Sequence, residues 1–346
     1  MPASSVLDSS SRIRCYTIAR KLADRATIEV LTLHGDPWTP RVRMSEWLLN
    51  FVRLLSIARN SAVQTKLFVQ RGESVAKALA LTFARRLTKC VVVFDFDDSI
   101  FLTSRLATRI MCQNADAIIV STRYLADYAR VHNPETYVVP TSIDLRVYSR
   151  TARGNNERPV IGWIGSPSNL KYLKILKEPL IALHQRHDYV FRIVTDLRYK
   201  DQVPLGTDVP YELVAWSLDN FVQILSTFDI GVAPLSDDAW TRGKSGYKIL
   251  EYMAMGIPAV ASKVEGNYGI FRDGFDGFLA EGCDEWVERL DILLTRPELR
   301  EALGRAGRKR VEQDFSMDLI ASRIGDLLAK LHYSDRRVRQ QQGAET

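Results

Sequence analysis

The chain has 346 residues, of which 46% are hydrophobic and 25% charged, with a formal net charge of +6. That length suffices for two globular domains of about 150 residues each, and the composition excludes a disordered chain. No run of about 18 apolar residues occurs, so we expect no transmembrane helix. The first residues, MPASSVLDSSSRIR, lack the apolar core of a signal peptide.

Cys15, Cys90, Cys112 and Cys283 are scattered, without the spacing of a metal site. We therefore expect four reduced thiols in a cytoplasmic protein. The positive net charge suits an anionic substrate, or a peripheral contact with an anionic membrane at the inner face of the plasma membrane. No pattern predicts nucleic-acid binding.

The N-terminal region begins unusually for an α/β domain, which normally opens with a hydrophobic strand. A polar stretch and the helix-like IARKLADRA precede a predicted strand, Ile28–Gly35, so the first strand is absent or reduced to Ser5–Leu7. A predicted helix in Pro40–Asn60 has a broad apolar face flanked by arginines. Such a helix either lies on an anionic membrane or covers a sheet with its apolar face inward.

An α/β alternation follows. The pattern predicts a strand at Lys66–Gln70 and a helix at Gly72–Leu87. The stretch Cys90–Ile100, CVVVFDFDDSI, predicts a buried parallel strand, Val91–Phe94, that ends in carboxylates. Catalytic residues often lie at the carboxyl ends of such strands, and alternation places Asp95 and Asp97 on one face.

The first domain is predicted to close with a strand at Asp116–Thr122 and a turn at Tyr137–Asp144, and polar Ser149–Pro159 is a linker. A second domain opens with the strand VIGWIG, which ends at Gly165. Ser166, Pro167 and Ser168 then lead into a helix. A strand, a Gly/Ser turn and a helix N-terminus together form an arrangement that can hold a phosphate.

Further strands are predicted at Phe191–Asp196, Tyr211–Trp216 and Asp229–Leu235, with a helix at Asn220–Phe228. Beyond residue 262, the predicted elements are a turn and strand at Gly274–Leu279 and helices at Glu285–Leu294, Pro297–Glu312 and Phe315–Leu331. The tail after His332 is polar.

The stretch Gly243–Ser262, GKSGYKILEYMAMGIPAVAS, has the clearest functional pattern. A small basic loop of Gly243, Lys244, Ser245 and Gly246 precedes a helix that Gly256 and Pro258 end, and a short buried strand follows. The free N–H groups at the helix start favour an anion, and its glycines allow close approach. Lys244 and Lys248 add positive charge, and Glu251 can accept hydrogen bonds from sugar hydroxyls. An ordinary α/β crossover with surface lysines is the alternative.

This stretch resembles the nucleotide-sugar loop of the GT-B glycosyltransferases, in the large retaining group often called family 4. That pattern is Glu, seven residues, Glu, then a run like AMAxGxPVVAS. Glu251 matches the second Glu, which holds the ribose, whereas Gly243 replaces the first. The resemblance implies two Rossmann-like domains that face a central cleft: residues 1–148 for the acceptor and 158–317 for the donor, with a helix at 318–334 crossing back to the first domain.

The resemblance also assigns roles to single residues. It implies that Gly165, Ser166, Ser168, Gly243, Ser245, Gly246 and Tyr247 line the donor site. Lys171 lies where the family has a cation for the diphosphate, with a solvated helix lysine as the alternative. Trp216 lies where the family frames the base, with a core tryptophan as the alternative. Arg12 and Arg14 are acceptor-side candidates with Asp95, each arginine having a solvated helix start as its alternative.

Three interpretations compete for the carboxylates after Val91–Phe94. Asp95-Phe96-Asp97 fits a phosphatase with an aspartyl nucleophile, although Asp237-Asp238 is the only further acidic pair available. A DxD metal site of the GT-A transferases is the second. The third is the GT-B strand end, where Asp97 takes the place of a catalytic His.

The resemblance thus implies a retaining glycosyltransferase that needs no metal or other cofactor and uses a nucleoside diphosphate sugar. Its acceptor would be a saccharide or a lipid-linked sugar in glycoconjugate or cell-envelope biosynthesis. Lys244 and Lys248 would stabilise the leaving diphosphate. The missing first Glu and catalytic His leave a catalytically inactive GT-B subunit, which partners another transferase, as an alternative.

Overall fold

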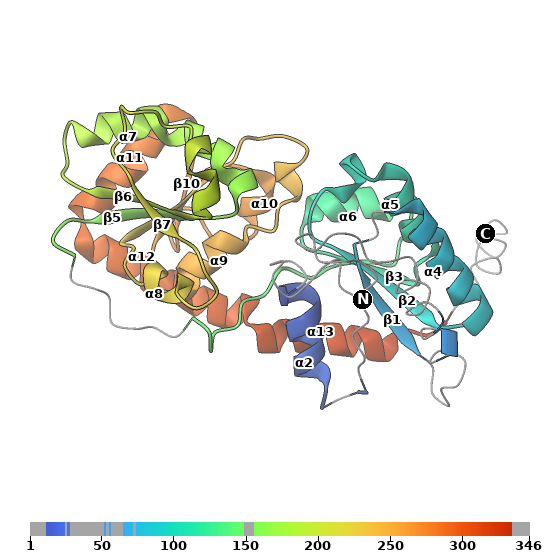
Figure 1. Ribbon diagram of the computed structural model, residues 1–346. Coiled ribbons are helices and arrows are strands. Elements are labelled where there is room, and N and C mark those ends of the chain that lie inside the picture. Colours follow the sequence, from blue (N-terminus) through green and yellow to red (C-terminus); the bar gives the residue numbers. More distant parts are fainter. Residues whose placement is uncertain are drawn as a thin grey trace. The chain divides into compact units, whose positions relative to one another are not determined.

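The computed structural model describes residues 12–24, 26–27, 52, 55–56, 65–71, 74–148 and 156–333. The chain divides into two compact units, each with its own parallel β-sheet (Figure 1). Unit 1 contains Met1–Thr141 and Asp318–Thr346, and unit 2 contains Ser142–Met317. No helix in the described part of the chain is long and apolar enough to cross a membrane.

The sheet of unit 1 has four parallel strands in chain order. They are β1 (Lys66–Gln70), β2 (Val91–Phe96), β3 (Ala117–Val120) and β4 (Thr136–Val138). The helices around it are η1 (Arg12–Tyr16), α2 (Thr17–Leu22), α4 (Val75–Thr88), η2 (Ile100–Leu102), α5 (Arg105–Asn114), α6 (Arg123–Arg130) and α13 (Met317–Lys330).

Strand β2 shows how this sheet is covered on both faces. Val92, Phe94 and Phe96 pack into one apolar cluster with buried residues of α4, α5 and α6. The alternate residues, Val91, Val93 and Asp95, point to the other face and are also fully buried. A strand that is buried on both faces has apolar residues at successive positions, so this strand can be predicted from the sequence.

The sheet of unit 2 has six parallel strands in the order β10-β9-β8-β5-β6-β7. They are β5 (Val160–Ile164), β6 (Val190–Thr195), β7 (Glu212–Ala215), β8 (Ile230–Ala233), β9 (Ala259–Ser262) and β10 (Phe278–Ala280). The helices are η3 (Pro167–Leu176), α7 (Lys177–His184), η4 (Leu197–Gln202), α8 (Phe221–Leu225), η5 (Thr241–Gly243), α9 (Tyr247–Ala254), α10 (Glu265–Tyr268), α11 (Gly282–Thr295), α12 (Pro297–Arg310) and η6 (Val311–Phe315).

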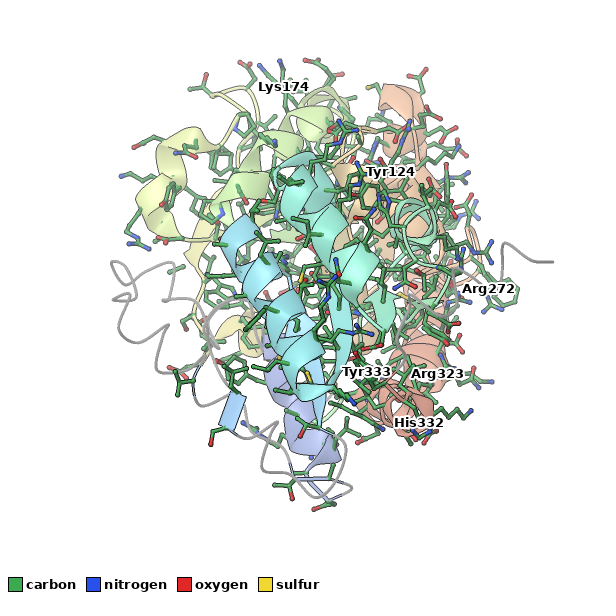
Figure 2. The ribbon with its side chains drawn as sticks, turned by 90° about the vertical axis from the view of Figure 1, so that its right-hand side faces the viewer. Tyr124, Lys174, Arg272, Arg323, His332 and Tyr333 are labelled. Carbon is green, nitrogen blue, oxygen red and sulfur yellow. The ribbon has the colours of Figure 1, made fainter. Side chains whose placement is uncertain are left out.

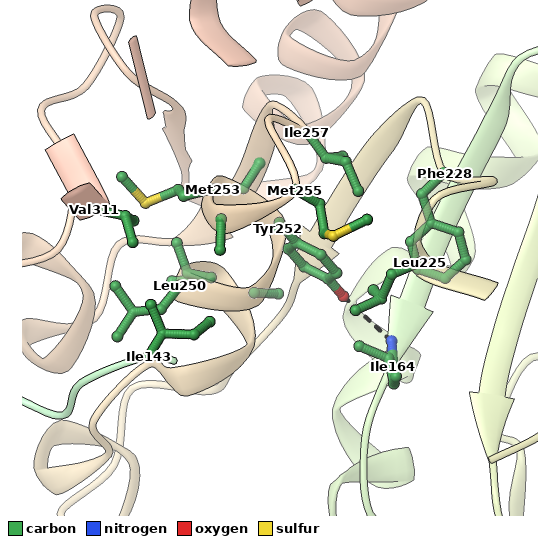
Figure 3. Packing of buried hydrophobic residues seen from close by; sticks show 14 of the residues in the cluster. Ile143, Ile164, Leu225, Phe228, Leu250, Tyr252, Met253, Met255, Ile257 and Val311 are labelled. Atoms are coloured by element: carbon green, nitrogen blue, oxygen red, sulfur yellow. Dashed lines mark hydrogen bonds between the residues drawn. The ribbon is translucent and has the colours of Figure 1, made fainter. Parts of the chain in front are cut away.

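Two apolar clusters cover the two faces of this sheet. Residues of η3, α7 and α11 form one with alternate side chains of β5 and β6. Residues of α8, α9 and η6 form the other, part of which Figure 3 shows. Each helix of a parallel sheet must bury its apolar stripe in this way, because the crossover connections place helices on both faces.

Several predicted boundaries change. Strand β2 continues to Phe96, so Asp95 lies inside it rather than after it. The predicted turn at Tyr137–Asp144 begins within strand β4, and the helix expected over Asn220–Phe228 covers only Phe221–Leu225. The predicted strand at Ile28–Gly35 and the segment 1–11 lie outside the described residues. So does the helix of 40–60, apart from three positions.

The boundary between the units lies at Thr141 rather than at residue 148. Ile143 forms a parallel bridge with Ser316, and Ile143 and Tyr148 are buried in the cluster around α9. The segment before the linker therefore packs with unit 2. The last helix, α13, belongs to unit 1 from Asp318 onward.

Candidate functional site

The strand order of unit 2 contains one reversal point, between β5 and β8. From β5 the chain adds β6 and β7 on one side, then returns to add β8, β9 and β10 on the other. In open parallel sheets, ligands bind at the carboxyl ends of the two strands that flank such a point. These ends are Ile164, followed by Gly165, and Ala233, which leads through a loop to α9.

Tyr252 of α9 joins the two strands where they separate. Strands β5 and β8 pair only at Ile161–Ile230 and Gly162–Gly231. Beyond that register, the Tyr252 hydroxyl accepts a hydrogen bond from the Ile164 N–H at 3.2 Å and donates one to the Val232 carbonyl at 3.2 Å. Figure 3 shows the first of these bonds inside the apolar cluster. The hydroxyl thus satisfies two buried backbone groups that the sheet leaves unpaired.

Glycine on β8 lets α9 sit directly on the sheet. A Cβ on Gly231 would lie 2.4 Å from the Tyr252 ring, a distance that real side chains do not reach. The helix that carries Lys248 and Glu251 is therefore fixed against the strands at the reversal point. The sequence shows Gly231 but not this contact.

The loop before α9 is equally constrained. Gly246 caps the helix with φ +60, a conformation that favours glycine, and a Cβ there would lie 1.9 Å from Ile270. Gly266 of α10 approaches the Lys244 carbonyl so closely that a Cβ would lie 2.3 Å from it. The contacts of Gly246 with Ile270 and of Gly266 with Lys244 fix the backbone of the predicted donor loop. Gly243, the first residue of that loop, is buried at the end of η5.

Lys248 lies at the reversal point itself. The Lys248 Nζ is 4.4 Å from the centroid of the Trp163 ring. A Cβ atom added to Gly165 would lie 3.2 Å from the same Nζ atom. Loss of hydration, reinforced by the nearby Lys244 ammonium and opposed by Glu251, lowers the pKa of Lys248 to about 7. The side chain can therefore gain a proton when an anion arrives.

Glu251 is buried one turn further along α9. The Tyr148 hydroxyl donates to Glu251 Oε1 at 2.7 Å, and it lies 3.0 Å from the Tyr247 hydroxyl. Its own burial and the Glu251 carboxylate raise the pKa of Tyr148 well above its usual value. The tyrosine therefore stays a donor and orients the carboxylate that was predicted to hold ribose.

The other predicted donor residues lie at the same edge of the sheet or beside it. Ser166 and Ser168 are exposed and hydrogen-bond each other at 3.1 Å, while Asn169 donates to Ser166 at 2.9 Å. Lys171 is exposed on η3, and Ser245 is half-buried in the loop. Trp216 follows β7, two strands away from β5, with 37% of its surface exposed.

Gly165 departs from the expected phosphate cradle. Its N–H donates to the Val194 carbonyl, and its carbonyl accepts from Thr195. Both of its backbone groups are therefore used inside the sheet edge. Because Gly165 has no side chain, the Trp163 ring and the Lys248 ammonium can lie close to where a Cβ atom would otherwise be.

In unit 1, the predicted acceptor-side pair forms a buried ion pair. Arg14 donates to both carboxylate oxygens of Asp95, at 2.9 Å from Nε and 2.5 Å from Nη2, and neither side chain has more than 2% exposed surface. Arg14 is therefore not a solvated helix start, and it joins η1 to the sheet. An aspartyl nucleophile must reach its substrate, so the burial of Asp95 argues against the phosphatase interpretation. The Arg12 side chain lies outside the described positions.

Asp97 follows β2 and is also buried. Arg71, the residue after β1, donates to Asp97 at 3.2 Å and to Asp98 at 2.5 Å. The ends of β1 and β2 are thus joined by Arg71, a cation that the sequence analysis did not identify.

The other acidic pair, Asp237 and Asp238, belongs to unit 2. Asp237 forms an ion pair with Arg242, and Asp238 accepts a hydrogen bond from the Thr241 N–H.

The sequence analysis did not identify four residues that contribute to these contacts: Tyr148, Trp163, Tyr252 and Arg71. Tyr148 precedes a polar linker, Trp163 lies in an apolar strand and Arg71 follows another. No local pattern marks any of them. Among the described residues, no cluster of three or more His, Cys, Asp or Glu side chains could hold a metal ion.

Residues 158–296 match the family model described as glycosyl transferases group 1. The matched segment lies within unit 2, which is therefore similar to the proteins of that family. The match spans the reversal point, the loop before α9 and Glu251.

The chain is also similar to curated relatives and to solved structures over most of its length. The spore coat protein SA of Bacillus subtilis is 20% identical over 94% of this chain and 95% of its own. The Escherichia coli UDP-Gal:alpha-D-GlcNAc-diphosphoundecaprenol alpha-1,3-galactosyltransferase is 23% identical over 65% of this chain and 60% of its own.

Among structures, sucrose-phosphate synthase from Thermosynechococcus elongatus has a TM-score of 0.71 at 16% identity, covering 95% of both chains. Anabaena HepE in complex with UDP has a TM-score of 0.65 at 16% identity, covering 84% of this chain and 85% of that one. The chain thus has the α/β fold with two parallel sheets of the GT-B glycosyltransferases.

Proposed function

We propose that this protein transfers a sugar from a nucleoside diphosphate sugar to a hydroxyl group of a saccharide or lipid-linked acceptor, with retention of configuration. The observation that carries the proposal is the convergence of Lys248, the start of α9 and Glu251 at the reversal point of unit 2. A structural neighbour, Anabaena HepE, has been solved with UDP-glucose.

The diphosphate would be held by the cations and the helix start. Lys244 precedes α9, Lys248 lies in its first turn and Lys171 lies on η3 after β5. Negative charge on the leaving diphosphate grows in the transition state, so fixed cations and a helix N-terminus lower the barrier there. These groups supply the stabilisation without a metal ion.

Glu251 would accept hydrogen bonds from the ribose hydroxyls. Its carboxylate is buried and held by Tyr148, so it is oriented before the nucleotide arrives. A carboxylate has about four acceptor sites on its two oxygens, so Tyr148 and a ribose diol could donate to the same group.

The acceptor would bind on unit 1, where Asp97 lies at the carboxyl end of β2. In a retaining reaction the acceptor oxygen attacks from the face that the diphosphate leaves. A diphosphate oxygen takes the acceptor proton, so Asp97 would orient the acceptor or stabilise positive charge at the anomeric carbon. A general base is then not required of it.

The test begins with a thermal-shift screen of UDP, GDP, TDP and ADP, followed by turnover of the matching nucleotide sugar. A ligand at about 100 times its dissociation constant adds about 2.7 kcal/mol of stability. NMR of the first-formed product then gives its anomeric configuration. Retention, with appreciable activity in Asp97→Asn, is expected; inversion with an inactive Asp97→Asn would make Asp97 the base and refute the retaining mechanism.

A non-catalytic subunit is the second candidate, and one observation favours it. Gly243 stands where the family has its first Glu, and it is buried at the end of η5 without a side chain to offer. Tight nucleotide binding with no donor turnover, with or without acceptors, would select this alternative.

A further inference from the structure

Two neighbouring helices of unit 1 carry large apolar side chains on their solvent side. Figure 2 shows α4 and α5 next to each other and facing the viewer, and the two helices are in contact. Their exposed apolar residues, with Leu102 of η2, are Val75, Leu79, Phe83, Leu87, Leu102 and Leu106. We call this set the α4/α5 face.

The α4/α5 face differs from the rest of the described surface. Fifteen large hydrophobic side chains are exposed in that part of the chain, and six of them lie here. Phe83 is 60% exposed and Leu106 is 58% exposed. Single exposed apolar residues need no explanation, whereas a grouping on two adjacent helices indicates an interaction site.

The charges on the same face have one sign. Neither α4 nor α5 contains an acidic residue. Arg86, Lys89, Arg105 and Arg109 are all exposed on these helices or directly after them. Arg85 is different, because it is buried and paired with Asp116. The solvent side of the two helices is therefore apolar and cationic at once.

We propose that the α4/α5 face docks on a bilayer surface that contains anionic lipids. Long arginine and lysine side chains can reach headgroup phosphates while Leu and Phe enter the acyl boundary between them. Each cation close to such a surface contributes about 1 kcal/mol of attraction. Helix α4, with fourteen residues, is about 21 Å long, enough to lie along the interface.

Charge distinguishes this occupant from a second copy of the chain. In a symmetric dimer the same patch meets itself, so four cations would face four cations. No acidic side chain on α4 or α5 could compensate them. An anionic lipid surface supplies the missing negative charge and needs no matching shape. This docking does not depend on which reaction the protein catalyses.

The experiment is flotation of the full chain with vesicles. One set is phosphatidylcholine alone, and the other contains about 30 mol % phosphatidylglycerol, a density that gives a strongly negative surface. We expect binding to the anionic set that weakens markedly between about 0.1 M and 0.5 M salt, because the Debye length falls over that range.

Two variants and their matched controls locate the surface. Arg105→Gln with Arg109→Gln should lower the partition coefficient about 30-fold, since two cations are removed. Phe83→Ser should lower it about tenfold through lost apolar insertion. The controls are Lys200→Gln with Lys309→Gln, and Phe275→Ser, all exposed residues of unit 2; they should bind like the unmodified chain.

The outcomes separate the alternatives. The basic segment of residues 40–60 stays intact in every variant, so normal binding by the α4/α5 variants would assign lipid contact elsewhere and overturn the proposal. Equal losses in the unit 2 controls, absence of binding to anionic vesicles, or a dimer that the Phe83→Ser change dissociates would also overturn it. Circular dichroism confirms that each variant is folded.

Discussion

Replacing Lys248 by Met should weaken nucleoside diphosphate binding and remove its dependence on pH. Lys248 lies against the Trp163 ring beside Gly165, where burial and Lys244 lower its pKa to about 7 from the usual 10.5. A bound diphosphate favours the ammonium, so it raises this pKa in the complex. Binding is therefore coupled to uptake of a proton above about pH 7.

The sign and size follow from that coupling. As the pH rises from about 7 to about 9, the protonated fraction of free Lys248 falls from about one half to about one hundredth, given its pKa of about 7. If the complex keeps the proton, the dissociation constant rises by up to about fifty-fold over this range, a loss of about 2.3 kcal/mol. The terminal phosphate titrates near pH 6 and gains charge as the pH rises, so the ligand cannot cause this loss.

Isothermal titration calorimetry measures both consequences. The unmodified protein should take up close to one proton per nucleotide near pH 8, seen as a dependence of the binding enthalpy on buffer. Lys248→Met should bind more weakly at pH 7 and take up none through this site. A pH-independent dissociation constant in the unmodified protein, or an equal slope in Lys248→Met, would refute the placement of Lys248 at the diphosphate.

Three further substitutions concern Glu251 and Tyr252 of α9 and Tyr148, which donates to Glu251. Glu251→Ala should weaken nucleotide binding by about 30-fold or more and Tyr148→Phe by about 5-fold, because one removes the ribose acceptor and the other its orienting donor. Binding of pyrophosphate, which has no ribose, should weaken far less than nucleotide binding in both variants, and an equal loss would contradict the ribose assignment. Tyr252→Phe should lower the free energy of unfolding of unit 2 by about 1–3 kcal/mol, since it leaves the Ile164 N–H and the Val232 carbonyl unpaired. Denaturation followed by the fluorescence of the four tryptophans of unit 2 measures it, and an unchanged midpoint would mean that another group satisfies these atoms.

Local patterns were sufficient for most of the fold. The strands at Lys66–Gln70 and Val160–Ile164 are short apolar runs bounded by turn residues, and both are found. Gly256 has φ +68 after α9, as the predicted helix ending requires. These features depend on neighbours within a few residues, so periodicity, glycine and proline reveal them.

Side-chain partners from distant segments were not predictable in the same way. Tyr148 and Glu251 are 103 residues apart, and Arg14 and Asp95 are 81 apart. The sequence shows that each residue is polar, yet only the packed structure shows that each carboxylate already has a donor. The acceptor-side role of Arg14 and Asp95 stays a prediction. Their pairing was not predicted, because the sequence does not distinguish two paired charges from two separate ones.

The poor hydration of the half-buried Lys248 has opposite effects in the empty and the occupied site. Without ligand, the Glu251 carboxylate does not offset the hydration that the Lys248 ammonium loses against Trp163, and releasing the proton removes that cost. With a diphosphate bound, the same poorly hydrated surroundings strengthen the attraction between the ammonium and the phosphate oxygens. Above about pH 7, a bound nucleotide would therefore restore the positive charge that the empty site loses. In the proposed reaction, the diphosphate would leave the sugar beside a cation that the fixed position of α9 holds in place. Such preorganisation is what stabilises a transition state.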